Sequence, residues 1–266
     1  MINFTLFGRE MKGSVKLLAV FAAVLTMYIA CIIYLYDPET MEMLDGFTKA
    51  MPELMAAVGM TPGAASLLGF MISYLYGFIM LVIPMIFIII RSISLVAKYV
   101  DRGSMVYLVS APVKRSTIAI TQVLSLICGI FILVLYGTVV EIVFAQALFP
   151  DQIVISELLS LNLGLFALHI FIGSVCFLCS CAFSDLKLAS GFGAGIPILM
   201  YIFQMLANMG GSVENFKYLT FFTLFDPEGL ASNEPSALIS ALVLLIGSLI
   251  LYAISVAVFS KKDLHI

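Results

Sequence analysis

The sequence predicts an all-α polytopic membrane protein with six transmembrane helices. Hydrophobic residues make up 62% of the chain and charged residues only 11%. A soluble domain is nearer half apolar and a quarter charged, so this chain has too few charges to cover a water-facing surface. Six apolar runs reach or approach the ~20 residues that a helix needs to cross a bilayer. Most of the surface is therefore expected to face lipid.

The charged residues divide unevenly between the two sides of such a bundle. Basic residues prefer the cytoplasmic side of a membrane. With both termini cytoplasmic, eleven of the thirteen basic residues are cytoplasmic, and only Lys49 and Lys217 are external. The cytoplasmic set is Arg9, Lys12, Lys16, Arg91, Lys98, Arg102, Lys114, Arg115, Lys187, Lys261 and Lys262. Eleven of the sixteen acidic residues fall on the opposite side. The sequence therefore predicts six spans with both termini in the cytoplasm.

Residues 1–14 (MINFTLFGREMKGS) are too short and too polar to span a bilayer. Phe4, Phe7 and Met11 recur at helical spacing with charged residues on other faces. This pattern favours an amphipathic helix at the membrane interface, with a frayed terminus as the alternative. The first span, 15–36, lacks a small-x-small cleavage site before the acidic segment that follows, so we expect it to be retained.

The other spans are expected at residues 66–90, 116–140, 158–183, 189–209 and 236–259. The third apolar run continues to residue 149, either as one tilted helix or as a span followed by an interfacial segment. Glu141 lies roughly 37 Å along a helix from Ser116. Since the bilayer core is ~30 Å thick, we expect Glu141 at the far interface rather than buried.

Residues 210–235 form an external segment rich in aromatic side chains. Its central part is too apolar for a solvated loop and too short to cross a bilayer. We expect it to pack on the bundle or to re-enter the membrane.

Three cysteines, Cys176, Cys179 and Cys181, have a spacing that occurs in metal sites. No second cluster of ligands lies nearby in the sequence, and a complete site needs one. We therefore interpret these cysteines as small apolar residues of a membrane helix, and no metal is expected.

A few polar side chains lie inside the spans. An intramembrane ionisable residue such as His169 is a functional hypothesis by default, although a histidine hydrogen-bonded between helices is the simpler alternative. Gln204 and Asn208 are likewise either contacts between helices or part of a pathway. The candidate pathway-lining residues are therefore His169, Gln204 and Asn208.

The motifs that the chain lacks exclude several classes of function. No G-x-x-x-x-G-K-[ST] phosphate loop and no H-E-x-x-H zinc motif occur, so no enzyme active site and no cofactor of its own are expected. No span carries the ring of charges that a channel filter uses. A transport bundle driven by a partner protein remains. Such a partner needs a compact cytoplasmic projection, and the loop at residues 91–115 is the only candidate.

Within this loop, residues 98–115 (KYVDRGSMVYLVSAPVKR), followed by Gln122, resemble the signature of permease subunits of the second exporter class of bacterial ABC transporters. Asp101 stands where that family usually has Glu, and Gln122 stands where it often has Lys. The aromatic segment 216–230 and the tail 259–264 (FSKKDL) are similar to two further family motifs. The three motifs follow the family's order along the whole chain.

The resemblance implies a coupling helix that docks on a separate ATP-binding cassette subunit, which would hold the ATP and Mg. The implied docking residues are Val100, Asp101, Arg102, Gly103, Tyr107, Pro112 and Arg115. Asp101 and Arg102 would make the polar contacts, and Gly103 would form the turn. A second permease copy or a related permease would complete the pathway, in a bacterial plasma membrane. The alternative is a solvated loop that only fixes the topology.

The expected function is export of a hydrophobic or amphipathic substrate, such as a peptide or drug, across the lipid bilayer, with no role for nucleic acid. A permease-like sensor or immunity component for antimicrobial peptides would have the same loops. An ATP-independent secondary carrier is a further alternative, and it would need paired charges inside the membrane.

Overall fold

The protein is all helical in the part of the chain that the structure describes. The computed structural model describes residues 2–60, 66–105, 108, 110 and 113–262, and no β-strand occurs among them. Six helices are long and apolar enough to cross a membrane, which confirms this part of the prediction. They are α1 (Phe4–Tyr34), α5 (Ile79–Leu95) extended by α6 (Ala97–Asp101), α8 (Arg115–Leu148), α9 (Ile155–Ala182), α10 (Leu186–Asn208) and α12 (Pro235–Lys261).

Shorter helices fill the connections between the long ones. They are α2 (Pro38–Ala50), α3 (Pro52–Ala57), α4 (Leu67–Met71), the π-helix η1 (Ile72–Tyr76), the 3-10 helices η2 (Gly211–Leu219) and η3 (Phe221–Leu224), and α11 (Pro227–Ala231). The prolines that open α3, α11 and α12 occupy first-turn positions, where a missing backbone N–H is tolerated.

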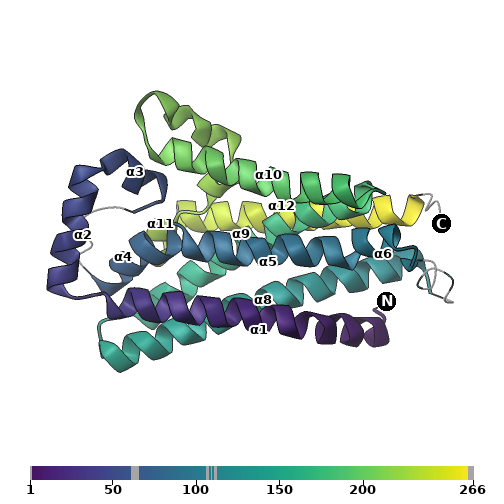
Figure 1. Ribbon diagram of the computed structural model, residues 1–266, viewed down its shortest axis with the longest axis horizontal. Helices are drawn as coiled ribbons and strands as arrows, with labels where there is room; N and C mark the ends of the chain where they lie inside the picture. The colour runs from purple at the N-terminus through teal and green to yellow at the C-terminus, as the bar shows by residue number, and fades with distance from the viewer. Residues whose placement is uncertain (1, 61–65, 106–107, 109, 111–112, 263–266) are drawn as a thin grey trace.

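The long helices run side by side along the longest axis of the molecule (Figure 1). The start of α1, the helix α6 and the last turns of α12 lie at one end, which we call the α6 end. The helices α2, α3 and α11 lie at the opposite end, which we call the α3 end.

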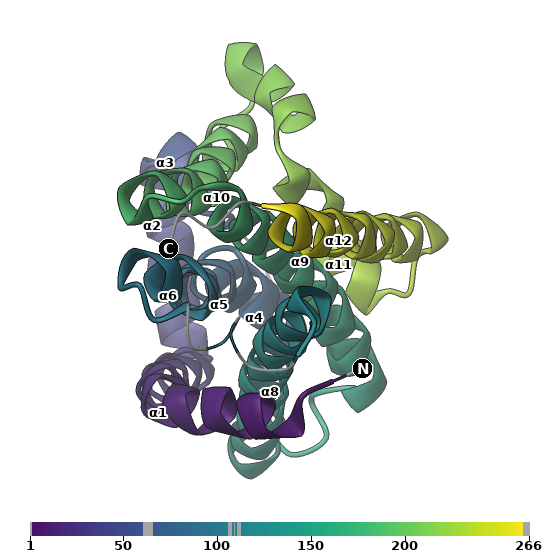
Figure 2. The same ribbon diagram turned by 90° about the vertical axis from the view of Figure 1, so that its right-hand side faces the viewer.

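Helix α9 forms the centre of the bundle, between α8, α10, α12 and α5 (Figure 2). In its most apolar window 72% of the residues are buried, against 28% for α12 and 22% for α1 and α10. Small residues allow this close packing. A Cβ atom added to Gly173 of α9 would lie 2.8 Å from the Tyr252 hydroxyl of α12. The less buried helices α1, α10 and α12 keep apolar faces that a membrane or a partner can cover.

Helix α1 is one continuous helix of 31 residues. At ~1.5 Å per residue it is roughly 46 Å long, which exceeds a ~30 Å hydrocarbon core. Its first turns run across the view in Figure 2, whereas the rest of α1 is seen nearly end-on. The expected amphipathic segment 1–14 and the first span therefore belong to one helix that changes direction. Leu6, Glu10 and Ser14, four residues apart, form the buried face of its first turns.

The second apolar run is interrupted in its first half. It begins as α4, continues as the π-helix η1, breaks at Gly77 and Phe78, and resumes as α5. The break lets the turn after α3 approach closely, because a Cβ atom on Gly59 would lie 2.8 Å from the Cα atom of Gly77. Gly59 also has a φ angle of 77°, which side-chain-bearing residues rarely adopt.

The second run also extends further than its expected end at residue 90. Helix α5 continues to Leu95, so Arg91 lies inside a helix and is buried rather than part of a solvated loop. A sequence boundary placed at the first charge fails here because this charge has a buried partner.

Helix α8 resolves the alternatives for the third run. It is a single helix of 34 residues, from Arg115 to Leu148, without a separate interfacial segment. Glu141 is fully buried, which corrects the expectation of an interfacial carboxylate. The distance along the helix axis could not reveal that Tyr76 of η1 and Asn162 of α9 cover this carboxylate.

The segment 210–235, which is expected to be external, contains two different parts. No residue of η2 is buried, and Tyr218 is 78% exposed. In contrast, Phe222, Phe225 and Leu230 are buried against the bundle. The second half of this segment therefore packs on the bundle, which was one of the two arrangements expected from the sequence.

Candidate functional site

The short helix α6 gives the loop after α5 its shape. Val100 is partly buried, whereas Asp101, Arg102 and Gly103 are exposed. Gly103 has a φ angle of 66°, which suits the turn expected at this glycine. Tyr107 and Pro112, two of the expected docking residues, lie outside the described residues.

The base of this loop is anchored to neighbouring helices. The Ala97 backbone N–H donates to the Ser180 hydroxyl of α9 at 3.0 Å. Arg115, expected where the chain returns to the membrane, opens α8 and donates to the Lys262 carbonyl at 2.9 Å. Lys262 in turn donates to the carbonyls of Cys181 and Ala182, and partial burial lowers the pKa of its ammonium group. The end of α12 is thus tied to both α8 and α9.

A buried ion pair joins α1 to α5 beside this loop. Arg91 Nη2 lies 3.0 Å from Glu10 Oε2 and 2.8 Å from the Glu10 carbonyl oxygen. The two side chains are only 7% and 5% exposed. Breaking a buried pair by removing one partner is costly, because the remaining charge is left without water or a counter-ion.

Three more side chains complete this group, which we call the Glu10 cluster. Tyr99 of α6 donates its hydroxyl to Glu10 Oε1 at 2.7 Å. Gln122 Nε2 of α8 lies 3.4 Å from the same oxygen. Ser125 of α8 accepts from Arg91 Nη2 at 3.2 Å. The Glu10 cluster therefore joins α1, α5, α6 and α8 at the α6 end.

Near the α3 end, a second buried carboxylate forms what we call the Glu141 triad. Tyr76 of η1 donates to Glu141 Oε2 at 2.8 Å, and Asn162 Nδ2 of α9 donates to the same oxygen at 2.9 Å. Among the described residues, Glu141 Oε1 and Asn162 Oδ1 have no hydrogen-bond partner. The triad holds an ionisable group in the protein core, where such groups are rare and costly.

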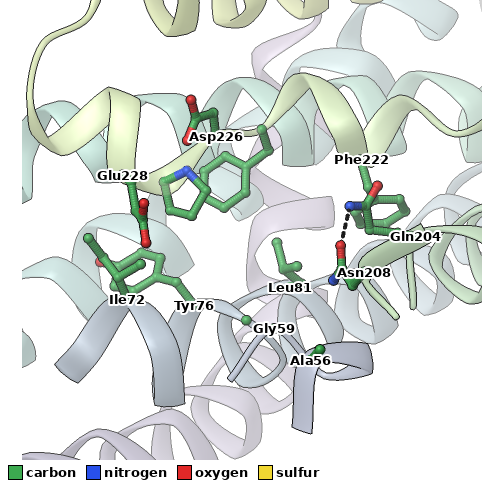
Figure 3. Close-up of a pocket in the computed structure, with 13 residues that line it drawn as sticks. Ala56, Gly59, Ile72, Tyr76, Leu81, Gln204, Asn208, Phe222, Asp226 and Glu228 are labelled. Carbon is green, nitrogen blue, oxygen red and sulfur yellow. Dashed lines mark hydrogen bonds between the residues drawn. The ribbon is translucent and has the colours of Figure 1, made fainter. Parts of the chain in front are cut away.

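A pocket at the α3 end, which we call the α3-end pocket, adjoins this triad (Figure 3). Tyr76 belongs to both the triad and the pocket lining. The pocket has a volume of about 300 Å³. Gln204 and Asn208 lie on one side, joined by a hydrogen bond of 2.8 Å, and Asp226 and Glu228 lie on another. Apolar side chains, including those of Leu81 and Phe222, complete the lining. Such a pocket suits a ligand with an apolar body and a positively charged group.

The structure separates the three candidate pathway residues. Gln204 and Asn208 line the α3-end pocket together. His169 lies in the fully buried core of α9, where its Nδ1 atom is 2.8 Å from the Leu165 carbonyl oxygen. Cys176 and Cys181 are also fully buried. No group of three metal-binding side chains gathers among the residues that the structure describes.

Sequence reasoning missed Glu10 as the centre of one polar group and misplaced Glu141, the centre of the other, at the interface. Glu10 was sorted with the solvated face of α1, although its spacing of four from Leu6 and Ser14 places it on the buried face. Tyr76 was not singled out, because nothing in its sequence neighbourhood indicates a π-helix. π-helices occur frequently at functional sites.

Comparison with known proteins gives no relative for this arrangement. No protein-family model matches the chain, and no curated protein and no solved structure shows a significant similarity to it. The functional argument therefore depends on the geometry and charges described above.

The buried ion pair predicts strong coupling between Glu10 and Arg91. The single substitution Arg91→Met leaves Glu10 buried without its counter-ion, so we expect it to lower the unfolding free energy by about 3–5 kcal/mol. Adding Glu10→Gln removes the stranded charge and should recover part of this loss. The measurement is reversible unfolding of the purified chain in detergent.

Lys217→Met is the matched control, since its ion pair with Glu214 lies on the exposed helix η2. Exposed pairs contribute little, so this variant should unfold as the wild type does. Equal stability of Arg91→Met and the wild type would contradict a structural role for the Glu10 cluster.

Proposed function

We propose that this chain is the membrane-spanning permease subunit of an ATP-driven exporter. It would work with a separate ATP-binding cassette subunit and would move a hydrophobic or amphipathic substrate out of the cell. The resemblance in residues 98–115 motivates this proposal, and the arrangement at the α6 end supports it.

The observation that carries the proposal is the rigid attachment of α6. Its exposed tip, formed by Asp101, Arg102 and Gly103, stands on a base that is fixed in two ways. The Tyr99 hydroxyl donates to Glu10 of α1, and the Ala97 backbone N–H donates to Ser180 of the central helix α9. A push on the tip is therefore transmitted to α1, α8 and α9 rather than absorbed by a loose loop. A coupling helix requires this property.

The distribution of charge supports an orientation with the α6 end in the cytoplasm. Arg9 and Lys12 of α1, Lys98 and Arg102 near α6, and Lys187 at the start of α10 lie towards the α6 end. Basic residues prefer the cytoplasmic side of a membrane. In a bacterial plasma membrane this side holds the soluble ATPases.

The weakly buried helices support a pathway made by two copies or by two related permeases. The apolar windows of α1, α10 and α12 are mostly unburied within one chain. A partner permease can cover part of this surface, and lipid can cover the rest. The α3-end pocket, with Asp226 and Glu228 beside apolar side chains, favours a cationic amphipathic substrate such as a peptide. A sensor or immunity component for antimicrobial peptides would use the same pocket without transport.

The test is co-purification of this chain with an ATP-binding cassette protein from the membranes of its own cells. We expect the two to elute together, and Arg102→Glu to reduce the recovered ATPase at least fivefold. Reversing an exposed charge at the tip disrupts docking without disturbing buried groups. Lys217→Glu, an exposed charge reversal at the α3 end, is the control and should retain the partner. A wild-type chain that elutes alone would contradict the proposal that it docks on an ATP-binding cassette subunit.

One observation favours a second candidate, an ATP-independent carrier coupled to protons. The Glu141 triad places a buried carboxylate beside the α3-end pocket, with Tyr76 shared between them. Proton-driven transporters use buried acidic residues in this way.

Glu141→Gln separates the two candidates. Glutamine keeps an oxygen that can accept from Tyr76, so we expect a loss of stability of at most about 1 kcal/mol and unchanged ethidium efflux in cells that express the complex. Efflux should also persist when an uncoupler collapses the proton gradient while ATP is maintained. Efflux that stops both with the uncoupler and in Glu141→Gln would favour the carrier instead.

A further inference from the structure

We propose that a cavity between α1, α5 and α6 binds the headgroup phosphate of an anionic phospholipid. This cavity, which we call the basic cavity, has a volume of about 610 Å³. Its charged lining residues are Arg9, Glu10, Arg91, Lys98 and Arg102. The site is separate from the α3-end pocket and shares only Arg102 with the α6 tip.

The charge balance of the basic cavity calls for an anion. Four cationic side chains face one carboxylate, and that carboxylate is already engaged. Glu10 Oε2 pairs with Arg91, and Glu10 Oε1 accepts from Tyr99. Among the described residues, Arg9, Lys98 and Arg102 form no ion pair. The cavity therefore keeps an excess of positive charge.

Arg91 adds a buried cation to the wall of the basic cavity. Its side chain is 7% exposed, and its guanidinium already donates to Glu10 and Ser125. The excess positive charge therefore comes from Arg9, Lys98 and Arg102. Arginine donors suit the oxygens of a phosphate group, which can accept several hydrogen bonds at once.

The apolar part of the cavity indicates a lipid rather than a free phosphate. Leu17 and Ile90 belong to its lining, and Ile90 is 44% exposed. These two residues lie on the membrane-facing side of Glu10 and Arg91 along their helices, while Lys98 and Arg102 lie further towards the α6 end. A ligand that contacts both parts needs a charged head and an apolar body. Basic pockets of this kind at the cytoplasmic ends of membrane helices bind lipid headgroups.

The occupant would also explain how α1 can cross the α6 end. Arg9 belongs to the first turns of α1, whereas Lys98 and Arg102 belong to α6 and the turn that follows it. One phosphate between them would offset their mutual repulsion and hold the two helices together. The inference does not depend on the exporter proposal, because it concerns this chain and its membrane alone.

The experiment is lipid titration of the purified full-length chain in detergent micelles, with the thermal midpoint as the readout. A ligand that binds the folded state raises the midpoint with its concentration. We expect phosphatidylglycerol to raise the midpoint, and phosphatidylcholine and inorganic phosphate to have no comparable effect. The double variant Arg9→Gln/Lys98→Gln should bind phosphatidylglycerol at least tenfold more weakly.

Lys12→Gln/Lys187→Gln is the matched control, because it removes the same charge at the α6 end without touching the basic cavity. This control should bind phosphatidylglycerol as the wild type does. Equal weakening in both double variants would overturn the site, since the effect would then be a general one of surface charge. A shift produced equally by inorganic phosphate would overturn the lipid assignment and indicate a free anion. No selectivity over phosphatidylcholine would overturn the proposal outright.

The side chains of Arg9 and Lys98 are exposed, so the Arg9→Gln/Lys98→Gln variant should fold. Its midpoint without lipid provides the check. Native mass spectrometry of the same samples gives a second measure, with retained phosphatidylglycerol expected on the wild type and lost from the Arg9→Gln/Lys98→Gln variant.

Discussion

The α6 end of this protein is organised by the buried ion pair between Glu10 and Arg91. Burying a carboxylate is costly unless a cation and hydrogen bonds compensate for the lost water. Here the cation is Arg91 of α5, and the hydrogen bonds come from Tyr99 of α6 and Gln122 of α8. Four segments that are distant in the sequence are thereby fixed to one another. The same arrangement turns α1 across the bundle, holds α6 in place and forms one side of the basic cavity.

The two ends of the bundle have different chemistry. At the α6 end the Glu10 cluster lies beside Arg9, Lys98 and Arg102, which form no ion pair within the described part of the chain, and Asp101 and Gly103 are exposed. At the α3 end the Glu141 triad lies beside a pocket with Asp226 and Glu228. Helix α9 spans the distance between them, with Ser180 bonded to the base of α6 and Asn162 in the triad. Helix α9 therefore connects the base of α6 to the Glu141 triad.

Hydropathy was sufficient to predict the six long helices, because a bilayer span requires only a long apolar run. It could not place the polar residues that those helices bury. Arg91 ends an apolar run and so resembles the start of a loop, but α5 continues past it to Leu95 and its side chain pairs with Glu10. The position of Glu141 was estimated from its distance along one helix, but its burial depends on Tyr76 and Asn162 in two other elements. These hydrogen bonds join residues that are distant in the sequence, so the hydropathy pattern of one segment cannot reveal them. Gln204 and Asn208 were each expected to contact other helices or to line a pathway; they also bond to each other, since a spacing of four places them on one helix face.

Accessibility of engineered cysteines in intact cells tests the central claim, that the α6 end faces the cytoplasm, most directly. In a background in which Cys31 is replaced by serine, Lys49→Cys lies in α2 at the α3 end and Lys187→Cys at the start of α10. The account predicts that a membrane-impermeant maleimide labels Lys49→Cys in intact cells and Lys187→Cys only after lysis. The reverse pattern would place the basic residues and α6 outside the cell. It would contradict both the docking of a cytoplasmic ATPase and the orientation on which the exporter proposal depends.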